Sequence, residues 1–225
     1  MMNRPDDTSS AIVRRSYIAV EGPIGVGKTS LAQRLALSLA GEAMLEQAYD
    51  NPFLERFYQN PRQAALPAQL YFLFQRTQQI SALRQSDLFS SVRVSDFMME
   101  KDRLFARATL DDDELRLYEQ VYAHMAIQAP QPDLVIYLQA PVEVLLTRIA
   151  RRAVPYERLI ESAYLHRLSN AYADFFHHYD EAPLLIINAA QIDPVNNEQD
   201  YALLLEQIGS VRSGRHYFNP LPVAL

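Results

Sequence analysis

Short apolar runs alternate with longer amphipathic segments along most of the chain. The runs at residues 17–21, 43–46, 92–96, 133–138 and 184–188 have the length and apolar character of buried strands. The longest amphipathic segment begins near Gln63, and its apolar positions recur at helical spacing: Leu66, Leu70, Leu73, Phe74, Ile80 and Leu83. Strands that alternate with helices predict an α/β fold, a doubly wound five-stranded parallel sheet with helices on both faces. Ligands of such folds bind at the carboxyl ends of the strands.

Length and composition limit the classes of protein that fit. A chain of 225 residues suits one domain, predicted over residues 16–209 between a flexible N-terminal tail, 1–15, and a C-terminal tail, 210–225. The net charge of −6 argues against broad electrostatic binding to nucleic acid, and no apolar run is long enough to cross a membrane. The lack of cysteine excludes disulfides and thiolate metal sites and agrees with the cytoplasmic location that we expect.

A glycine-rich loop joins the first predicted strand to the helix that follows. Residues 22–29, Gly-Pro-Ile-Gly-Val-Gly-Lys-Thr, fit the pattern G-x-x-x-x-G-K-[ST] of the phosphate-binding P-loop. Backbone N–H groups of such a loop wrap a phosphate, and Lys28 adds a positive charge at the β- and γ-phosphate oxygens. The hydroxyl of Thr29 is a candidate ligand of Mg²⁺. The residues expected to bind ATP here are Gly22, Gly25, Val26, Gly27, Lys28, Thr29 and Ser30.

Three arginines supply the positive charge that phosphoryl transfer requires. Arg148, Arg151 and Arg152 fall on one side of a predicted helix. This helix ends before Val154, and we expect residues 148–158 to form a lid that closes over the nucleotide. A solvated basic face near a helix C-terminus would show the same spacing, because cations are favourable there. The P-loop elsewhere in the chain favours the lid.

Polar side chains at two strand ends and on the long helix complete the set of candidates. Asp96 ends the third predicted strand, as an acid that helps to hold Mg²⁺ does, and Glu46 ends the second. Strand-end acids also serve as caps or ion-pair partners, so position alone is weak evidence. Gln69 and Arg76 lie on one face of the long helix and could bind a base through paired hydrogen bonds. The alternative is that both side chains face solvent.

These blocks resemble the deoxynucleoside kinases, above all the bacterial deoxyguanosine and deoxyadenosine kinases. The resemblance extends from about residue 17 to 190 and rests on residues 17–31, 50–58, 69–76, 95–106 and 148–157. It implies a three-layer P-loop kinase fold and an enzyme that uses ATP and Mg²⁺ to phosphorylate the 5′-hydroxyl of a deoxynucleoside. The closest resemblance favours a purine nucleoside. A homodimer formed through the long helices is also implied.

The resemblance implies a role for each candidate residue. The catalytic residues would be Glu46, which takes the proton from the 5′-hydroxyl, and the cations Lys28, Arg148 and Arg152 at the phosphates. The Mg²⁺ ligands would be Thr29 and Asp96. The nucleoside would be held by Glu46 at the 5′-hydroxyl, by Tyr58 and Glu157 at the 3′-hydroxyl, by Gln69 at the base, and by Arg76 and Asp102 along the base pocket.

Two positions depart from the family pattern. The usual arginine after the strand-end acid is replaced, because Phe97 follows Asp96. The lid usually carries another arginine two residues after the position of Arg152, with a glycine between, where this chain has Val154 and Ala153. One missing cation can cost orders of magnitude in rate, so a nucleotide-binding sensor protein with little catalysis stays an alternative. A nucleoside-monophosphate kinase of the thymidylate kinase type is another, although its expected acid–arginine pair is absent too.

Overall fold

A parallel sheet of six strands, in the order β2-β3-β1-β4-β5-β6, forms the centre of the computed structural model. The structure describes residues 15–85, 92–125 and 129–219. The strands are β1 (Tyr17–Glu21), β2 (Glu42–Met44), β3 (Arg93–Ser95), β4 (Leu134–Gln139), β5 (Leu184–Asn188) and β6 (Arg215–Phe218). Strands β1 and β4 are buried along almost their whole length, which explains why their sequences are continuous apolar runs.

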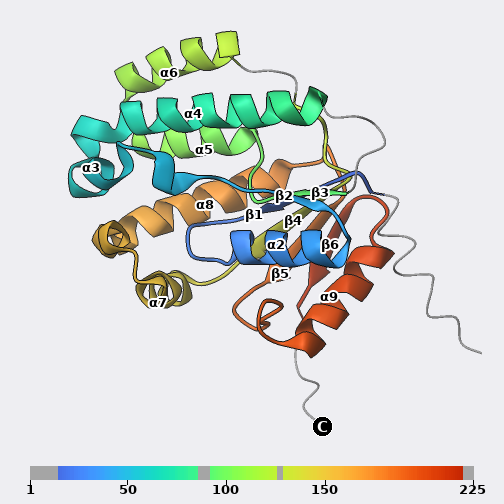
Figure 1. The fold of residues 1–225 in the computed structure, drawn as a ribbon. Helices are drawn as coiled ribbons and strands as arrows, with labels where there is room; N and C mark the ends of the chain where they lie inside the picture. Colours follow the sequence, from blue (N-terminus) through green and yellow to red (C-terminus); the bar gives the residue numbers. More distant parts are fainter. Residues whose placement is uncertain (1–14, 86–91, 126–128, 220–225) are drawn as a thin grey trace, which may run out of the picture.

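Helices cover both faces of the sheet (Figure 1). Helices α2 and α9 lie on one side, and α8, α5 and α4 lie on the other, with α6 outermost. The α-helices are α2 (Lys28–Ser38), α3 (Leu54–Gln59), α4 (Pro61–Gln85), α5 (Glu100–Thr109), α6 (Asp112–Met125), α7 (Val142–Arg152), α8 (Ser162–His178) and α9 (Glu198–Ser210). Two short 3₁₀ helices are η1 (Ala48–Asp50) and η2 (Pro155–Leu159). Among the described helices, none has both the length and the apolar character that a membrane span needs.

The predicted α/β fold is confirmed, with six strands in place of the five expected. The additional strand, β6, lies within the segment 210–225 that was expected to be a tail, and it pairs in parallel with β5. Its sequence, Arg-His-Tyr-Phe, is polar at one end and alternates between exposed and half-buried positions. An edge strand of this kind lacks the apolar run that identified the others.

The two ends of the predicted domain differ in part from expectation. Residues 1–14 of the predicted N-terminal tail lie outside the described part of the chain. Arg15, by contrast, is buried, and its guanidinium donates a hydrogen bond to the backbone oxygen of Val211. Arg15 therefore belongs to the folded domain. Residues 220–225 of the predicted C-terminal tail also lie outside the described part.

The predicted apolar stripe of α4 packs against the layer formed by α5 and α6. Leu73 and Ile80 are buried in a cluster with Phe97 and Tyr118, which confirms those two positions. Phe74 differs, because its side chain is 50% exposed. The side chain of Leu83 lies outside the described part of the chain.

Candidate active site

The P-loop leaves the carboxyl end of β1 and leads into α2. A side chain at Gly22 would place its Cβ 2.4 Å from the backbone oxygen of Leu138 in β4, so only glycine fits there. Gly27 caps α2 in the left-handed conformation, at φ 108°, without a side-chain hydrogen bond to the helix. The first turn of α2 also contains no acid. Its N–H groups are therefore available to an anion, and the helix dipole favours one.

Lys28 turns back over this loop. Its Nζ donates hydrogen bonds to the backbone oxygens of Gly22, at 2.7 Å, and Pro23, at 3.0 Å. Burial and, after it, the positive charge of Lys101 lower the pKa of Lys28 to about 8. An anion bound beside Nζ would stabilise the charged form again, so the ammonium and an anionic ligand favour each other.

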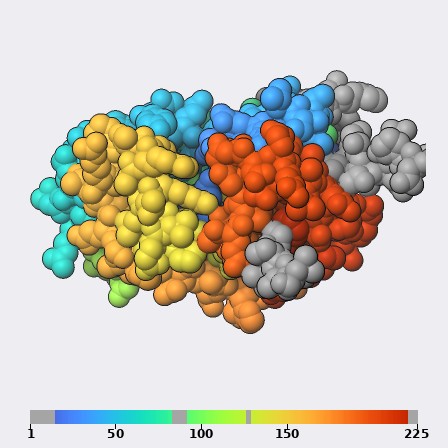
Figure 2. Space-filling model, turned by 90° about the horizontal axis from the view of Figure 1, so that it is seen from below, coloured from blue at the N-terminus to red at the C-terminus, as the bar shows by residue number. Residues whose placement is uncertain are grey.

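A cavity of about 330 Å³ lies over the P-loop, and we call it the donor cavity. Its lining comprises residues 25–31, Leu138, Arg148, Arg151, Arg152, Ala189 and residues 192–196. Figure 2 shows α7, in yellow, facing the red segment around α9, with blue atoms of the P-loop region between them. The guanidinium of Arg148 donates to the backbone oxygens of Val26, at 2.9 Å, and Ala189, at 2.6 Å. Arg148 therefore ties the P-loop to the loop after β5.

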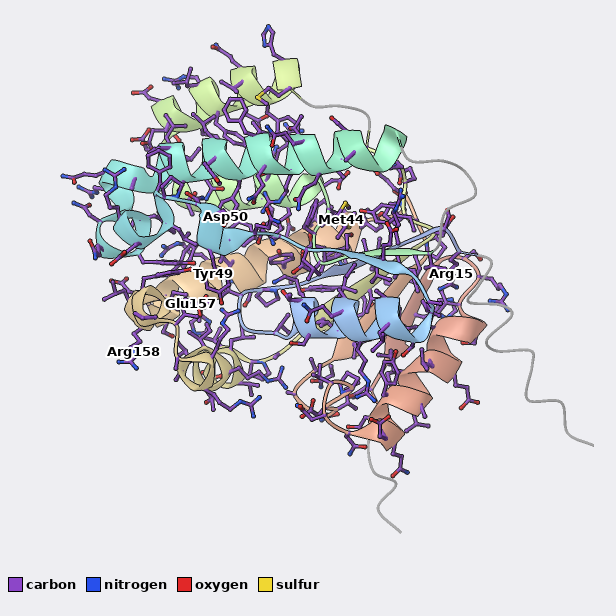
Figure 3. The ribbon with its side chains drawn as sticks, viewed as in Figure 1. Arg15, Met44, Tyr49, Asp50, Glu157 and Arg158 are labelled. Atoms are coloured by element: carbon purple, nitrogen blue, oxygen red, sulfur yellow. The ribbon has the colours of Figure 1, made fainter. Side chains whose placement is uncertain are left out.

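A second cavity, of about 290 Å³, adjoins the first and is called the acceptor cavity. Its polar lining residues include Glu46, Tyr58, Gln69, Arg76, Asp96, Lys101 and Glu157. Its aromatic lining residues are Tyr49, Phe57, Phe72, Phe105, Tyr156 and Tyr164. Figure 3 shows Tyr49 of η1 and Glu157 of η2 at the same edge of the molecule, while Arg158 points outward. Both cavities share Gly25, Lys28, Thr29, Ser30 and Arg152, so they meet over the P-loop lysine.

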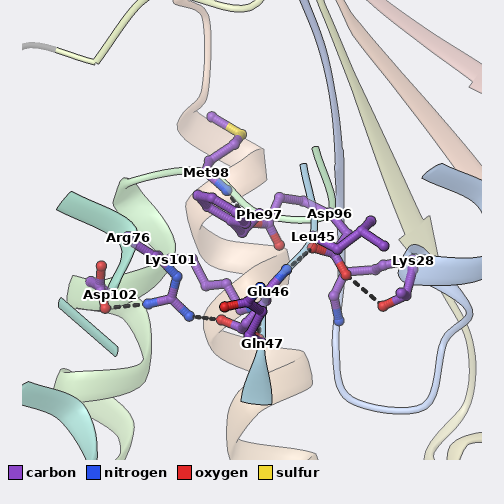
Figure 4. A network of polar contacts seen from close by, with 12 residues as sticks. Lys28, Leu45, Glu46, Gln47, Arg76, Asp96, Phe97, Met98, Lys101 and Asp102 are labelled. Carbon is purple, nitrogen blue, oxygen red and sulfur yellow. Dashed lines mark hydrogen bonds and ion pairs between the residues drawn. The ribbon is translucent and has the colours of Figure 1, made fainter. Parts of the chain in front are cut away.

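Two acidic residues, Glu46 and Asp96, are neighbours in the wall of the acceptor cavity. Asp96 accepts hydrogen bonds from the backbone N–H of Glu46, at 2.7 Å, and from the hydroxyl of Thr29. The side chain of Glu46 forms ion pairs with Arg76 and, at 2.9 Å, with Lys101 (Figure 4). Burial by itself would raise the pKa of Glu46, but Arg76 and Lys101 hold it well below its usual value. Glu46 is therefore an ionised carboxylate at neutral pH.

Asp102 lies behind Arg76 and not in the wall of the acceptor cavity. It is fully buried and pairs with the guanidinium of Arg76, while its Oδ2 has no partner among the described residues. Burial raises the pKa of Asp102 to about 7, with Arg76 opposing the rise and Glu46 adding to it. Asp102 was expected to line the base pocket. In the structure it contacts Arg76, and Arg76 lines the acceptor cavity in its place.

Gln69 presents an unsatisfied amide to the acceptor cavity. Its side chain comes from α4 and is 3% exposed. The oxygen Oε1 has no hydrogen-bond partner within the described part of the chain. Because a buried acceptor without a partner is costly, a ligand that donates a hydrogen bond here would bind more tightly.

The predicted lid contributes to both cavities. Arg152 donates to Glu157 through Nε at 2.8 Å and through Nη2 at 2.6 Å, a bidentate ion pair. Tyr58 and Tyr156 stack with their ring centroids 6.0 Å apart, and both line the acceptor cavity beside Glu157. Arg152, the last residue of α7, borders the donor cavity as well. The end of α7 and the residues that follow it therefore link the two cavities.

A sequence profile of the deoxynucleoside kinases matches residues 18–212. The chain belongs to the deoxynucleoside kinase family. Deoxyguanosine kinase of Bacillus subtilis is 32% identical over 190 residues, which cover 82% of this chain and 92% of that protein. Deoxyguanosine kinase of Lactobacillus acidophilus is 30% identical over 208 residues, 86% of this chain and 89% of that protein. A structure of M. mycoides deoxyadenosine kinase with the products dCMP and dCDP bound shares the fold, with a TM-score of 0.76 and 24% identity over 86% of this chain and 99% of that one.

Most residues singled out by the sequence come together around the two cavities of this family member. The acceptor cavity includes Glu46, Tyr58, Gln69, Arg76, Asp96 and Glu157, and the donor cavity includes Gly25, Val26, Gly27, Lys28, Thr29, Ser30, Arg148 and Arg152. Two residues lie apart. Gly22 supports the loop from behind, and Asp102 acts through Arg76.

The two departures from the family pattern are both buried residues. Phe97 is 0% exposed and Val154 is 9% exposed, so neither side chain replaces an arginine at the surface of a cavity. Arg151, one residue before Arg152, lines the donor cavity and adds a cation there. Helix α7 therefore contributes three arginines to the donor cavity despite the valine.

Sequence reasoning assigned no role to two buried charged residues, Glu21 at a strand end and Lys101. Glu21 accepts hydrogen bonds from the backbone N–H of Met98, at 2.7 Å, and from the hydroxyl of Tyr172, at 2.9 Å. It thereby fixes the start of the P-loop against the segment that carries Asp96. The only feature of the sequence that pointed to Glu21 was its position at the end of the first strand. No such feature pointed to Lys101.

Proposed function

We propose that this deoxynucleoside kinase transfers the γ-phosphate of ATP to the 5′-hydroxyl of a deoxynucleoside, giving the 5′-monophosphate. The main support is that two cavities meet over Lys28, and that the carboxylate of Glu46 lines the acceptor cavity. The donor cavity offers backbone N–H groups and arginines, which suit polyphosphate. The acceptor cavity has aromatic walls and a few polar groups, which suit a nucleoside.

Glu46 is proposed as the acceptor of the hydroxyl proton. Its low pKa makes the carboxylate a weak base, which is adequate if the phosphoryl group passes through a loose transition state and the proton leaves late. Glu46 then acts mainly by orienting the 5′-oxygen. Lys28, Arg148 and Arg152 are proposed to stabilise the negative charge of the phosphates.

Thr29 and Asp96 fit the expected Mg²⁺ ion. Their oxygens are held together by a hydrogen bond at the start of α2, beside the donor cavity. Mg²⁺ typically takes one or two protein oxygens and completes its shell with phosphate oxygens and water. When bound, the ion would supply positive charge at the phosphates, and Asp96 would also keep the backbone of Glu46 in place.

The proposed base is a purine, guanine or adenine. Several related enzymes are named deoxyguanosine or deoxyadenosine kinases. In this chain, the amide of Gln69 can donate and accept together, and Arg76 adds donors from the same helix. A paired hydrogen bond between such an amide and a purine edge would satisfy the buried oxygen of Gln69.

A homodimer and a cytoplasmic location remain predictions. Phe74 of α4, 50% exposed, and Leu117 of α6, 48% exposed, are apolar side chains that a partner bound on these outer helices would cover.

Thermal shift separates the kinase from its closest alternative. We expect saturating deoxyguanosine or deoxyadenosine to raise Tm by several degrees, because each would bind only the folded protein. Thymidine monophosphate should raise Tm less, since its phosphate would meet the carboxylate of Glu46. A larger shift with the monophosphate than with either nucleoside would favour the nucleoside-monophosphate kinase. Binding of nucleosides without any consumption of labelled ATP would favour the sensor protein.

A further inference from the structure

The residue after Asp96, Phe97, brings no cation to the site. Phe97 is fully buried in the apolar cluster with Leu73 and Tyr118, and it does not line the acceptor cavity. The centroid of its ring lies 5.8 Å from the guanidinium carbon of Arg76. A charge at this position would be buried among apolar groups at high cost.

Lys101 brings a cation to the acceptor side by another route. It lies in the first turn of α5, its side chain is 3% exposed, and its Nζ donates to Oε2 of Glu46 at 2.9 Å. That is its one hydrogen-bond partner among the described residues, and an ammonium has three donors. Two N–H groups therefore remain for a ligand in the acceptor cavity, which Lys101 lines.

Burial of this lysine has a cost, because a positive charge in the first turn of a helix opposes the helix dipole and an ammonium loses its hydration. The ion pair with Glu46, the charge of the buried Glu21 and the ring of Phe105, whose centroid lies 5.5 Å from Nζ, offset this cost. Glu46 already has a second cationic partner in Arg76. A buried cation in the wall of a ligand cavity points to a role in binding or catalysis in addition to its structural contacts.

The charge of Lys101 acts on several buried ionisable groups near it. Together with Arg76 it outweighs burial and keeps the pKa of Glu46 low. It adds to the burial that lowers the pKa of Lys28, and it opposes the burial that raises the pKa of Glu21. Figure 4 shows Lys101 beside Glu46, on the side of the network away from Asp96 and Lys28. Both lysines line the acceptor cavity, and Lys28 lines the donor cavity as well.

We propose that Lys101 is the acceptor-side cation of phosphoryl transfer, holding the carboxylate of Glu46 against the 5′-hydroxyl and neutralising charge on the transferring group. This role presupposes the kinase activity proposed above. The 5′-oxygen forms a bond to the γ-phosphorus while the bond from that phosphorus to the β,γ-bridging oxygen breaks. ADP leaves with the electron pair, the hydroxyl proton passes to Glu46, and Lys101 keeps its protons throughout. Lys101 thus provides the charge that Phe97 does not.

Substitution of Lys101 by methionine tests the role. Lys101→Met should lower kcat by about 100- to 1000-fold, as the loss of one transition-state donor does. The KM for the nucleoside should change by less than about threefold, because the charge acts chiefly on the transition state. Lys101→Arg, which keeps the charge, should recover most of kcat.

Arg103→Met is the matched control, since Arg103 lies on the same helix and pairs with Glu119 away from the cavities. It should keep the kcat of the wild type. Lys101→Gln retains a hydrogen-bond donor for Glu46 and loses only the charge, and it decides the outcome if the methionine variant does not fold. A kcat within about threefold of the wild type in either charge-free variant would overturn the role of Lys101. If the wild type itself makes no deoxynucleoside monophosphate, the kinase proposal fails instead.

Discussion

At the scale of single residues, the site is built from buried side chains of opposite charge around Glu46. Arg76 and Lys101 pair with its two oxygens, and Asp102 fixes Arg76 from behind. The surrounding cations keep Glu46 ionised, while burial and the positive charge of Lys101 lower the pKa of Lys28. The ligand-free site is therefore arranged to receive a polyphosphate, which relieves the repulsion between its cations.

The pKa of Lys28 leads to a pH prediction. Burial lowers it to about 8 in the free enzyme, so Lys28 is charged below that pH and loses its proton as the pH rises through it. Since kcat/KM reports ionisations of the free enzyme, kcat/KM for ATP should fall as the pH rises above about 8. Lys28→Arg should lower the overall rate and remove this limb, because arginine stays protonated. A wild-type kcat/KM that is flat up to pH 10 would refute the assignment.

At the scale of elements, the segment after α7 differs from the family pattern in its backbone as well as in its charge. Ala153 ends α7 in the left-handed conformation, at φ 58°, where the pattern has glycine. Val154 then packs into the protein, and η2 brings Glu157 to Arg152. An arginine in place of Val154 would have to leave a buried position, so the structure offers no simple gain from restoring it.

Ala153→Gly should stabilise the protein. An alanine in the left-handed region carries a steric cost, so glycine should raise the free energy of unfolding by about 0.5–1 kcal/mol. The measurement is urea denaturation at constant protein concentration. Ala150→Gly is the matched control, because Ala150 lies within the same helix and its side chain is exposed. This substitution should lower the free energy of unfolding by about 1 kcal/mol. If both variants lose the same free energy of unfolding, the turn at Ala153 is not strained.

The sequence predicted the elements whose apolar pattern is local, and it missed those that depend on tertiary pairing. Strands β1 and β4 are apolar runs, and they were predicted within a residue of their bounds. Strand β6 carries little apolar signal and forms because β5 offers a free edge. Lys101 was not predicted because its role also depends on a tertiary contact: its partner Glu46 lies 55 residues away in the sequence. Lys28 was found because its role depends on a contiguous motif.

At the scale of the whole molecule, the parallel sheet brings distant segments to one edge. The donor cavity combines the loop after β1 with α7 and the loop after β5, and the acceptor cavity combines the loop after β2 with α4, α5 and η2. Each cavity is thus assembled from several parts of the chain, and the P-loop belongs to both. This arrangement accounts for a transfer between two bound molecules better than for the binding of one nucleotide.

The most direct test of this account is the rate at which 5′-monophosphate forms from ATP and each of the four deoxynucleosides. We expect turnover with deoxyguanosine or deoxyadenosine, and a kcat lower by several orders of magnitude in Glu46→Gln with nucleoside binding largely retained. Mass spectrometry of the product identifies the phosphorylated species. Absence of product from all four nucleosides, or an unchanged kcat in Glu46→Gln, would contradict it.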